Sequence, residues 1–124
     1  MFCLPLVRQI LRSFVILQRE EFNLDLTAKN FDSIINNHDT VLVDFYAQWC
    51  GPCKLQGNIL KAFEDKHPGK FVIGKMDVDD EPSIAQRYRI TTVPTLIVFA
   101  KGEAVQRAQG VQTVEQLEMM LGQS

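Results

Sequence analysis

The sequence predicts an α/β domain in which a central mixed β-sheet is flanked by helices on both faces. Short apolar runs typical of strands alternate along the chain with segments whose apolar residues recur at helical spacing. The run Thr40–Ala47 is apolar on both faces except for one acid, which is typical of a central strand covered on both sides. Two further runs meet at Lys101–Gly102, which predicts a hairpin and therefore an antiparallel part of the sheet.

The first half of the domain carries two predicted strands and two predicted helices. Phe22–Leu26 alternates apolar and polar residues, as a short strand does. Thr27 is a suitable N-cap for a helix over Ala28–Asn36, where the apolar residues form one stripe. The central strand Thr40–Ala47 follows. Cys53–Lys66 is then predicted to be a helix that ends at a His-Pro-Gly turn.

The second half predicts a strand, a short helix, the hairpin and a final helix. Lys70–Val78 is the strand, and Pro82–Tyr88 is a helix with proline at its first position, where the missing N–H is not needed. The hairpin pairs Pro94–Ala100 with Glu103–Gln109. The last helix, over Thr113–Leu121, begins with a Thr-x-x-Gln capping box. The resulting order, βαβαβαββα, places helices on both faces of the sheet.

Length and charge narrow the possible functions. With 124 residues, of which 46% are hydrophobic and 23% charged, the chain is long enough for one globular domain. Its formal net charge of −2 argues against a nucleic-acid partner, because such a protein needs a basic surface to replace the counterions of the phosphates.

The N-terminal segment differs in charge from the rest of the chain. It contains three arginines, and all 15 acidic residues of the chain lie from Glu20 onward. Read as a helix it is amphipathic, and no run in it is long and apolar enough to span a bilayer. We therefore expect a targeting presequence over residues 1–20, which contains Cys3, and a domain over residues 21–124. This division predicts a mitochondrial matrix protein without membrane contact after processing. The alternatives for the segment are an extra N-terminal helix or a signal anchor, and the alternative location is the cytoplasm.

Cys50 and Cys53 form a Cys-Gly-Pro-Cys motif between the central strand and the next helix. Two thiols at this spacing can close a disulfide. The free N–H groups and partial positive charge of a helix N-terminus favour the thiolate, so the pKa of the first cysteine should be lowered. We expect Cys50 to be exposed and to attack a partner's disulfide, and Cys53 to be shielded and to resolve the mixed disulfide. Gly51 would let a substrate backbone approach and Pro52 would fix φ, and both would help to set the redox potential.

A structural zinc site and a pair of unreactive cysteines are the alternatives for this motif. Zinc needs four ligands, but the chain has no second cysteine pair, and its two histidines lie in predicted turns without ligand spacing. Free cysteines are often buried, but a turn between a strand and a helix is a poor place to hide two of them. We therefore expect no metal and a redox-active Cys50–Cys53 disulfide.

Five segments of this chain resemble the corresponding segments of thioredoxins, in the same order and at the same spacing. These segments are VDFYAQWCGPCK, GKMDVDD, ITTVPTLIVF, KGE and Gly110 before the last helix. The resemblance covers residues 21–124 and implies the thioredoxin fold and the reduction of protein disulfides. It also implies that no cofactor is bound and that electrons come from NADPH through a flavoprotein, thioredoxin reductase. The expected partners are this reductase and disulfide-containing client proteins, and we expect the chain to be a monomer.

Asp44 is the acid on the doubly covered central strand. Burial without a counterion should raise its pKa and leave it partly protonated near neutrality, so that it can exchange a proton with Cys53 directly or through a water. The resemblance matches Asp44 to the family's buried acid, and Lys75 to the lysine that tunes the titration of that acid. The alternative for Asp44 is an aspartate at a strand end that faces water, and the functional role is favoured because an unpaired buried carboxylate is otherwise costly. For Lys75 alone the evidence is weaker, since a lysine on a strand end is usually a solvated charge.

Pro94 directly follows Val93 at the start of an apolar strand, where proline is tolerated. In thioredoxins this proline is cis and packs beside the cysteines, which implies that the backbone of Val93 is free to pair with an extended substrate. The resemblance also implies that Trp49 and Gly110 complete the apolar substrate groove. The alternatives for these two residues are a core tryptophan and a plain turn glycine.

One position departs from the family pattern. Asn58 stands where thioredoxins typically have a helix-kinking proline, and it follows Gly57. Because asparagine keeps its N–H, the enforced kink is lost, which affects the tilt of the first helical turn and the redox potential. Two other functions on the same fold stay open. One is a disulfide oxidant or isomerase, which Pro52 in place of a histidine disfavours, and the other is a partner-binding subunit without catalysis.

Overall fold

The computed structural model describes residues 22–122, and the predictions made for residues 1–20, including Cys3, lie outside this range. The elements follow the predicted order. They are β1 (Phe22–Asp25), α2 (Phe31–Asn37), β2 (Thr40–Tyr46), α3 (Gly51–Lys66), β3 (Val72–Asp77), α4 (Pro82–Arg87), β4 (Thr95–Ala100), β5 (Glu103–Gln109) and α5 (Val114–Met120). Within the described range, no helix has the length and hydropathy needed to cross a membrane.

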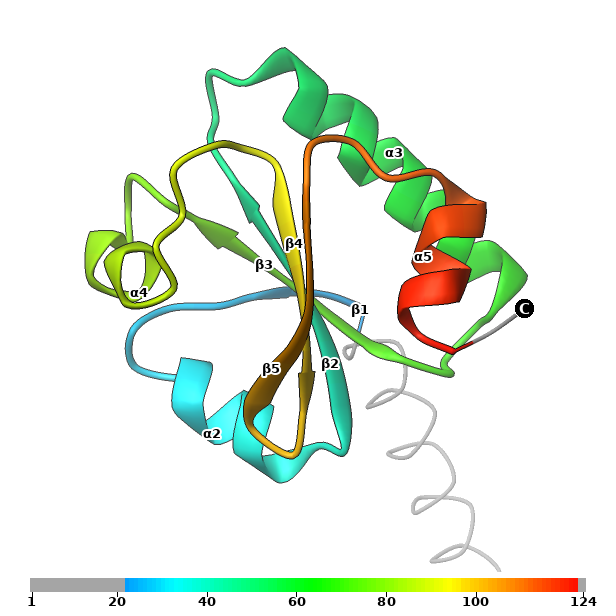
Figure 1. The fold of residues 1–124 in the computed structure, drawn as a ribbon, viewed down its shortest axis with the longest axis horizontal. Helices are drawn as coiled ribbons and strands as arrows, with labels where there is room; N and C mark the ends of the chain where they lie inside the picture. Colours follow the sequence, from blue (N-terminus) through cyan, green and yellow to red (C-terminus); the bar gives the residue numbers. More distant parts are fainter. Residues whose placement is uncertain (1–21, 123–124) are drawn as a thin grey trace, which may run out of the picture.

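The strands form one mixed sheet in the order β1-β3-β2-β4-β5 (Figure 1). β3 runs parallel to both β1 and β2, whereas β4 is antiparallel to β2 and to β5. The predicted hairpin is therefore present, and β2 lies at the centre of the sheet. In the register of the sheet, Asp44 on β2 is paired with Lys75 on β3 and with Leu96 on β4.

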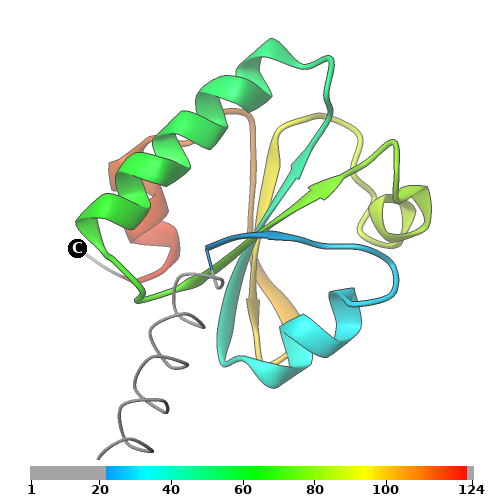
Figure 2. The ribbon, with the colours of Figure 1, turned by 180° about the vertical axis from the view of Figure 1, so that it is seen from behind.

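The alternation of side chains along β2 separates two apolar cores. Val41, Val43 and Phe45 pack in one core with residues of α2 and α4. Leu42 packs in the other core with residues of α3 and α5. Figures 1 and 2 show these two helix pairs on opposite sides of the sheet. Because successive side chains point to opposite faces of a strand, Asp44 shares the face of Leu42 and lies on the side covered by α3.

α2 begins at Phe31, later than predicted. Thr27 Oγ1 accepts the N–H groups of Lys29 and Asn30 at 3.2 and 3.3 Å, and Asn30 Oδ1 accepts the Thr27 N–H at 2.7 Å. These bonds close a separate turn ahead of the helix. The prediction that Thr27 caps the helix is therefore wrong, and α2 starts from Asn30 without a side-chain cap.

α3 begins at Gly51, earlier than predicted, because Cys50 is its N-cap. The Cys50 sulfur accepts the Cys53 N–H at 3.2 Å, which brings the residues between the cysteines into the helix. From there the helix runs without interruption past Asn58 to Lys66, where the predicted helix also ends.

The last helix confirms its predicted capping box. The Gln116 N–H donates to Thr113 Oγ1 at 3.2 Å, and the Thr113 N–H donates to Gln116 Oε1 at 2.8 Å. Because Thr113 is the N-cap, α5 itself begins at Val114.

Candidate active site at the start of α3

Cys50 and Cys53 lie at the N-terminal end of α3, just after the loop that leaves the central strand. They form a disulfide, with Cα atoms 5.3 Å apart. Cys50 has an extended backbone, and the Cys53 N–H donates to its sulfur at 3.2 Å. Gly51 and Pro52, between the cysteines, are exposed. The first sulfur thus receives one of the free N–H groups of the helix, an arrangement that stabilises negative charge on it.

The prediction that Cys50 is exposed is wrong. Its relative exposure is 4%, against 6% for Cys53, so both side chains are buried. Cys50 packs with Ala47 and Cys53, with Val93 against them, and its sulfur lies 3.7 Å from the Val93 carbonyl oxygen. Exposure therefore does not distinguish the two cysteines. Their positions on the helix do, because Cys50 precedes α3 and Cys53 lies within its first turn.

The Val93–Pro94 peptide bond is cis, as the family resemblance implied. Pro94 is buried, and its carbonyl oxygen accepts the Gly110 N–H at 2.8 Å. Gly110 has a φ of +82°, a conformation that glycine adopts far more readily than other residues. The structure therefore brings Gly110 to Pro94 and places Val93 against Cys50.

Trp49 is not a core tryptophan, because 74% of its surface is exposed. Its indole Nε1–H donates to Asp79 Oδ2 at 2.9 Å. Asp79 lies in the loop after β3, where Asp77 Oδ1 accepts the N–H groups of Asp79 and Asp80 at 2.9 and 3.3 Å. Sequence reasoning missed Asp79 as a site residue, since it lies 30 positions from Trp49 and no local pattern joins the two.

Asp44 lies on the α3 side of β2 and is only 4% exposed. Burial raises its pKa from 3.8 to about 7, and the positive charge of Lys75 opposes part of that rise. Its Oδ1 is buried and has no hydrogen-bond partner in the described part of the chain. The predicted burial and raised pKa of this acid are confirmed.

Lys75 is the register partner of Asp44, but its ammonium group turns to other residues. Its Nζ lies 3.6 Å from Asp25 Oδ1 and 5.9 Å from the centre of the Tyr46 ring. Lys75 therefore acts on Asp44 through its charge rather than through a hydrogen bond.

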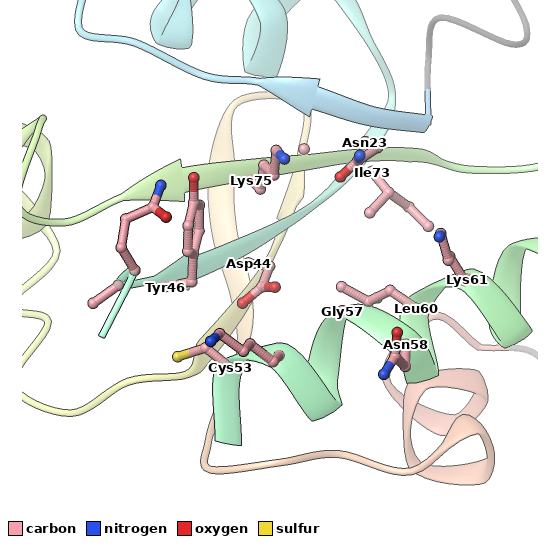
Figure 3. Close-up of a pocket in the computed structure, with 14 residues that line it drawn as sticks. Asn23, Asp44, Tyr46, Cys53, Gly57, Asn58, Leu60, Lys61, Ile73 and Lys75 are labelled. Atoms are coloured by element: carbon pink, nitrogen blue, oxygen red, sulfur yellow. The ribbon is translucent and has the colours of Figure 1, made fainter. Parts of the chain in front are cut away.

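A cavity of about 370 Å³ adjoins Asp44 and Cys53. Figure 3 shows both side chains among its lining residues, together with Lys75 and Asn58. Gly57 also lines it, and a Cβ added to Gly57 would meet no atom within 4 Å. The cavity offers space for water beside the buried acid. In the range that the structure describes, no group of three or more His, Cys, Asp or Glu residues is placed to hold a metal ion.

The comparisons with known proteins agree on the family of this chain. The family model described as Thioredoxin matches residues 22–123. A thioredoxin from Alicyclobacillus acidocaldarius is 40% identical over 98 residues, which cover 79% of this chain and 93% of that protein. A mitochondrial thioredoxin from Mus musculus is also 40% identical, over 90 residues that cover 73% of this chain and 54% of the mouse protein. The chain therefore spans about half the length of this mitochondrial relative and nearly all of the bacterial one.

Solved structures show the same fold. A mutant thioredoxin from Halobacterium salinarum aligns with a TM-score of 0.74 and 31% identity, over 82% of this chain and 90% of that chain. Chloroplastic thioredoxin z aligns with a TM-score of 0.73 and 28% identity, over 82% of this chain and 92% of that chain. These likenesses confirm the predicted mixed sheet flanked by helices.

Proposed function

Because the chain belongs to the thioredoxin family, we propose that it reduces client proteins with its Cys50–Cys53 dithiol and is reduced in turn by thioredoxin reductase, with electrons from NADPH. Thioredoxins are dithiol disulfide reductases, and this chain has the cysteine pair that the activity needs. The observation that carries the proposal is the Cys53 N–H, which donates to the Cys50 sulfur at 3.2 Å at the start of α3.

Cys50 is the nucleophile in this proposal. In the reduced protein, the helix N-terminus and the Cys53 N–H favour the Cys50 thiolate, which attacks one sulfur of the client's disulfide. A mixed disulfide forms, and the client's other sulfur leaves as a thiolate and takes up a proton. Cys53, as a thiolate, then attacks the Cys50 sulfur. The client leaves with both cysteines reduced, and the Cys50–Cys53 disulfide carries the two-electron oxidation.

Asp44 is proposed to accept the proton of Cys53. The two residues line the same cavity, where water can bridge them. A pKa of about 7 leaves a substantial fraction of Asp44 ionised at neutral pH, and a general base works best when its pKa is near the working pH. Lys75 supports this role, because its charge keeps the pKa of Asp44 from rising further.

Client binding is proposed to use Trp49, the Val93 backbone, Pro94 and Gly110. An extended client segment would pair with the Val93 backbone and lie against the exposed indole ring. We refer to the surface between these four residues as the client groove. Because Cys50 is buried, the client has to bring its disulfide into this groove rather than meet a protruding thiol.

A mitochondrial location is proposed from residues 1–20 alone. Their three arginines and the absence of acid before Glu20 support import. The bacterial and the mouse mitochondrial relative are both 40% identical to this chain, so the likeness favours neither compartment. N-terminal sequencing of the protein from cells tests the proposal. A mature start between about residues 15 and 22 supports import, whereas an intact Met1 points to the cytosol.

Insulin reduction tests the proposed activity. With thioredoxin reductase and NADPH, the full chain should oxidise NADPH in step with insulin reduction. Cys50→Ser should abolish turnover, and Cys53→Ser should accumulate a mixed disulfide with insulin, because the resolving thiol is missing. Turnover that persists in Cys50→Ser would show that the nucleophile is misassigned, and an inactive wild type would leave only a partner-binding role.

A further inference from the structure

Gln56 places an amide on the buried face of α3. The other buried residues of that helix are Cys53, Leu60 and Phe63, and the relative exposure of Gln56 is 0%. A buried amide is costly unless both its donor and its acceptor find partners. The presence of Gln56 at this position therefore depends on specific contacts.

The partner of Gln56 is the backbone of Gln112. The Gln112 N–H donates to Gln56 Oε1 at 2.7 Å, and Gln56 Nε2 donates to the Gln112 carbonyl at 3.1 Å. One side chain thus satisfies both backbone groups of a distant residue, as a neighbouring strand would. Gln112 lies between β5 and α5, in a segment without helix or strand, and Figure 1 shows this connection running beside α3. An apolar side chain in place of Gln56 would leave both backbone groups of Gln112 without these partners.

Gln112 in turn contacts the edge of the client groove. Its Nε2 donates to the carbonyl oxygens of Gln109 and Gly110 at 3.2 and 3.1 Å. The Gly110 N–H donates to the Pro94 carbonyl at 2.8 Å. An unbroken series of hydrogen bonds therefore joins the helix that carries Cys53 to two residues of the groove.

We propose that Gln56 is a positioning residue that holds the Gly110–Gln112 segment against Pro94 and so keeps the client groove in one shape. This inference rests on the proposed function, in which Pro94 and Gly110 bind the client. Gln56 acts through Gln112 rather than on the reacting sulfurs. Its loss should therefore weaken the use of protein clients, which fill the groove, more than exchange with a small disulfide, which only has to reach Cys50.

The experiment compares two substrates in the full chain. Insulin reduction with reductase and NADPH gives kcat and KM for a protein client, and the small aromatic disulfide DTNB gives a second-order rate constant. Gln56→Leu should raise the insulin KM roughly threefold to tenfold, the effect of losing hydrogen bonds, with a smaller change in kcat and in the DTNB rate. Gln112→Ala, which removes only the contacts to Gln109 and Gly110, should raise the same KM. In the double variant the two effects should not add, because both act on one series of contacts.

Ile35→Val is the matched control, because it loosens the apolar core on the opposite face of the sheet and leaves the groove untouched. It should not change the ratio of insulin to DTNB efficiency. Amide exchange of the Gln112 N–H gives a second measurement, and Gln56→Leu should speed it at least roughly tenfold. If Gln56→Leu does not fold, Gln112→Ala decides the question by its insulin KM. Equal losses with both substrates, or an unchanged insulin KM, would overturn the inference, whereas an inactive wild type would instead overturn the proposed function.

Discussion

Asp44 and Lys75 are register partners on neighbouring strands, yet the Lys75 ammonium lies 3.6 Å from Asp25 Oδ1. Asp44 Oδ1 is buried and has no hydrogen-bond partner in the part of the chain that the structure describes. The nearby positive charge lowers the pKa of Asp44, but the loss of hydration raises it by more, and the pKa lies at about 7. Ionisation of Asp44 therefore costs folding free energy and takes place close to neutral pH.

Asp44→Asn should stabilise the oxidised protein at alkaline pH. The raised pKa means that the folded protein binds this proton more tightly than the unfolded chain does. The protonated carboxyl therefore contributes its full stabilisation below about pH 4, and this contribution is lost as the pH rises through about 7. The change in the pKa of Asp44 from 3.8 to about 7 corresponds to roughly 4 kcal/mol. Urea denaturation should show the variant more stable than the wild type by up to this amount near pH 8. Near pH 4 the two proteins should be close to equal. A pH-independent difference between them would contradict the account.

Asp44→Asn should also slow insulin reduction near neutral pH. The amide of the variant cannot accept the Cys53 proton. Water in the adjoining cavity can accept it, but less effectively than the carboxylate does. We expect a loss of about tenfold to a hundredfold, which is at or below the low end of the effect of a positioned base because water replaces the carboxylate in part. The ionisation of Asp44 should add a rise in the wild-type rate with a midpoint at about pH 7, and the variant should lack this contribution. An identical pH profile in both proteins would exclude Asp44 as the base.

Lys75→Met should raise the pKa of Asp44 above its wild-type value of about 7. The lysine charge favours the carboxylate, and its removal leaves desolvation unopposed by that charge. NMR titration of the Asp44 carboxyl measures the change directly. Lys29→Met, on the exposed turn before α2, removes an equal charge away from the acid and serves as the control. A midpoint that stays fixed or falls in Lys75→Met would show that the lysine charge does not act on Asp44.

Asp79→Ala should free the indole ring of Trp49. The hydrogen bond between them spans 2.9 Å and joins two exposed side chains, so its loss should change the stability by about 1 kcal/mol or less. The insulin KM should nevertheless rise several-fold, since the groove loses a fixed ring. Trp49 is the only tryptophan of the chain, so its fluorescence anisotropy reports the ring alone. Unchanged anisotropy in the variant would show that Asp79 does not hold the ring.

Substitution by alanine should have opposite effects on the stability of the protein at two glycines. Gly57 lies within α3 with open space where the methyl group of an alanine would stand, so Gly57→Ala should stabilise the protein by roughly 0.5–1 kcal/mol. Gly102 has a φ of +85°, and a Cβ there would collide with the Asn36 side chain, so Gly102→Ala should destabilise it. Thermal unfolding of both variants measures the contrast. Equal shifts would show that helix propensity and turn geometry do not govern these sites.

The order of the elements could be predicted because it depends on local periodicity. The run Thr40–Ala47, apolar on both faces except for one acid, predicted a central strand, and it also predicted that Asp44 would be buried, because a strand apolar on both faces is covered on both sides. The capping box at Thr113 was equally local. Thr27 was misread because a threonine that caps a helix and one that closes a turn have the same sequence signal.

The remaining features of the site depend on contacts between distant segments. Cys50 is buried because Val93 packs against it from 43 positions away, which its place before a helix did not reveal. Gln56 is buried and bonds to the backbone of Gln112, which lies 56 positions further along the chain. Such contacts follow from the assembled fold and leave no periodic signal in the sequence.

The cavity beside Asp44 and Cys53 does not have Val93, Pro94 or Gly110 among its lining residues. A client seated over Cys50 would therefore leave the route between solvent and the resolving cysteine open. Under the proposed mechanism, protons can then exchange with the solvent through this cavity during the mixed-disulfide stage. The turnover rate should then depend on pH with the same midpoint for a large folded client as for a short peptide.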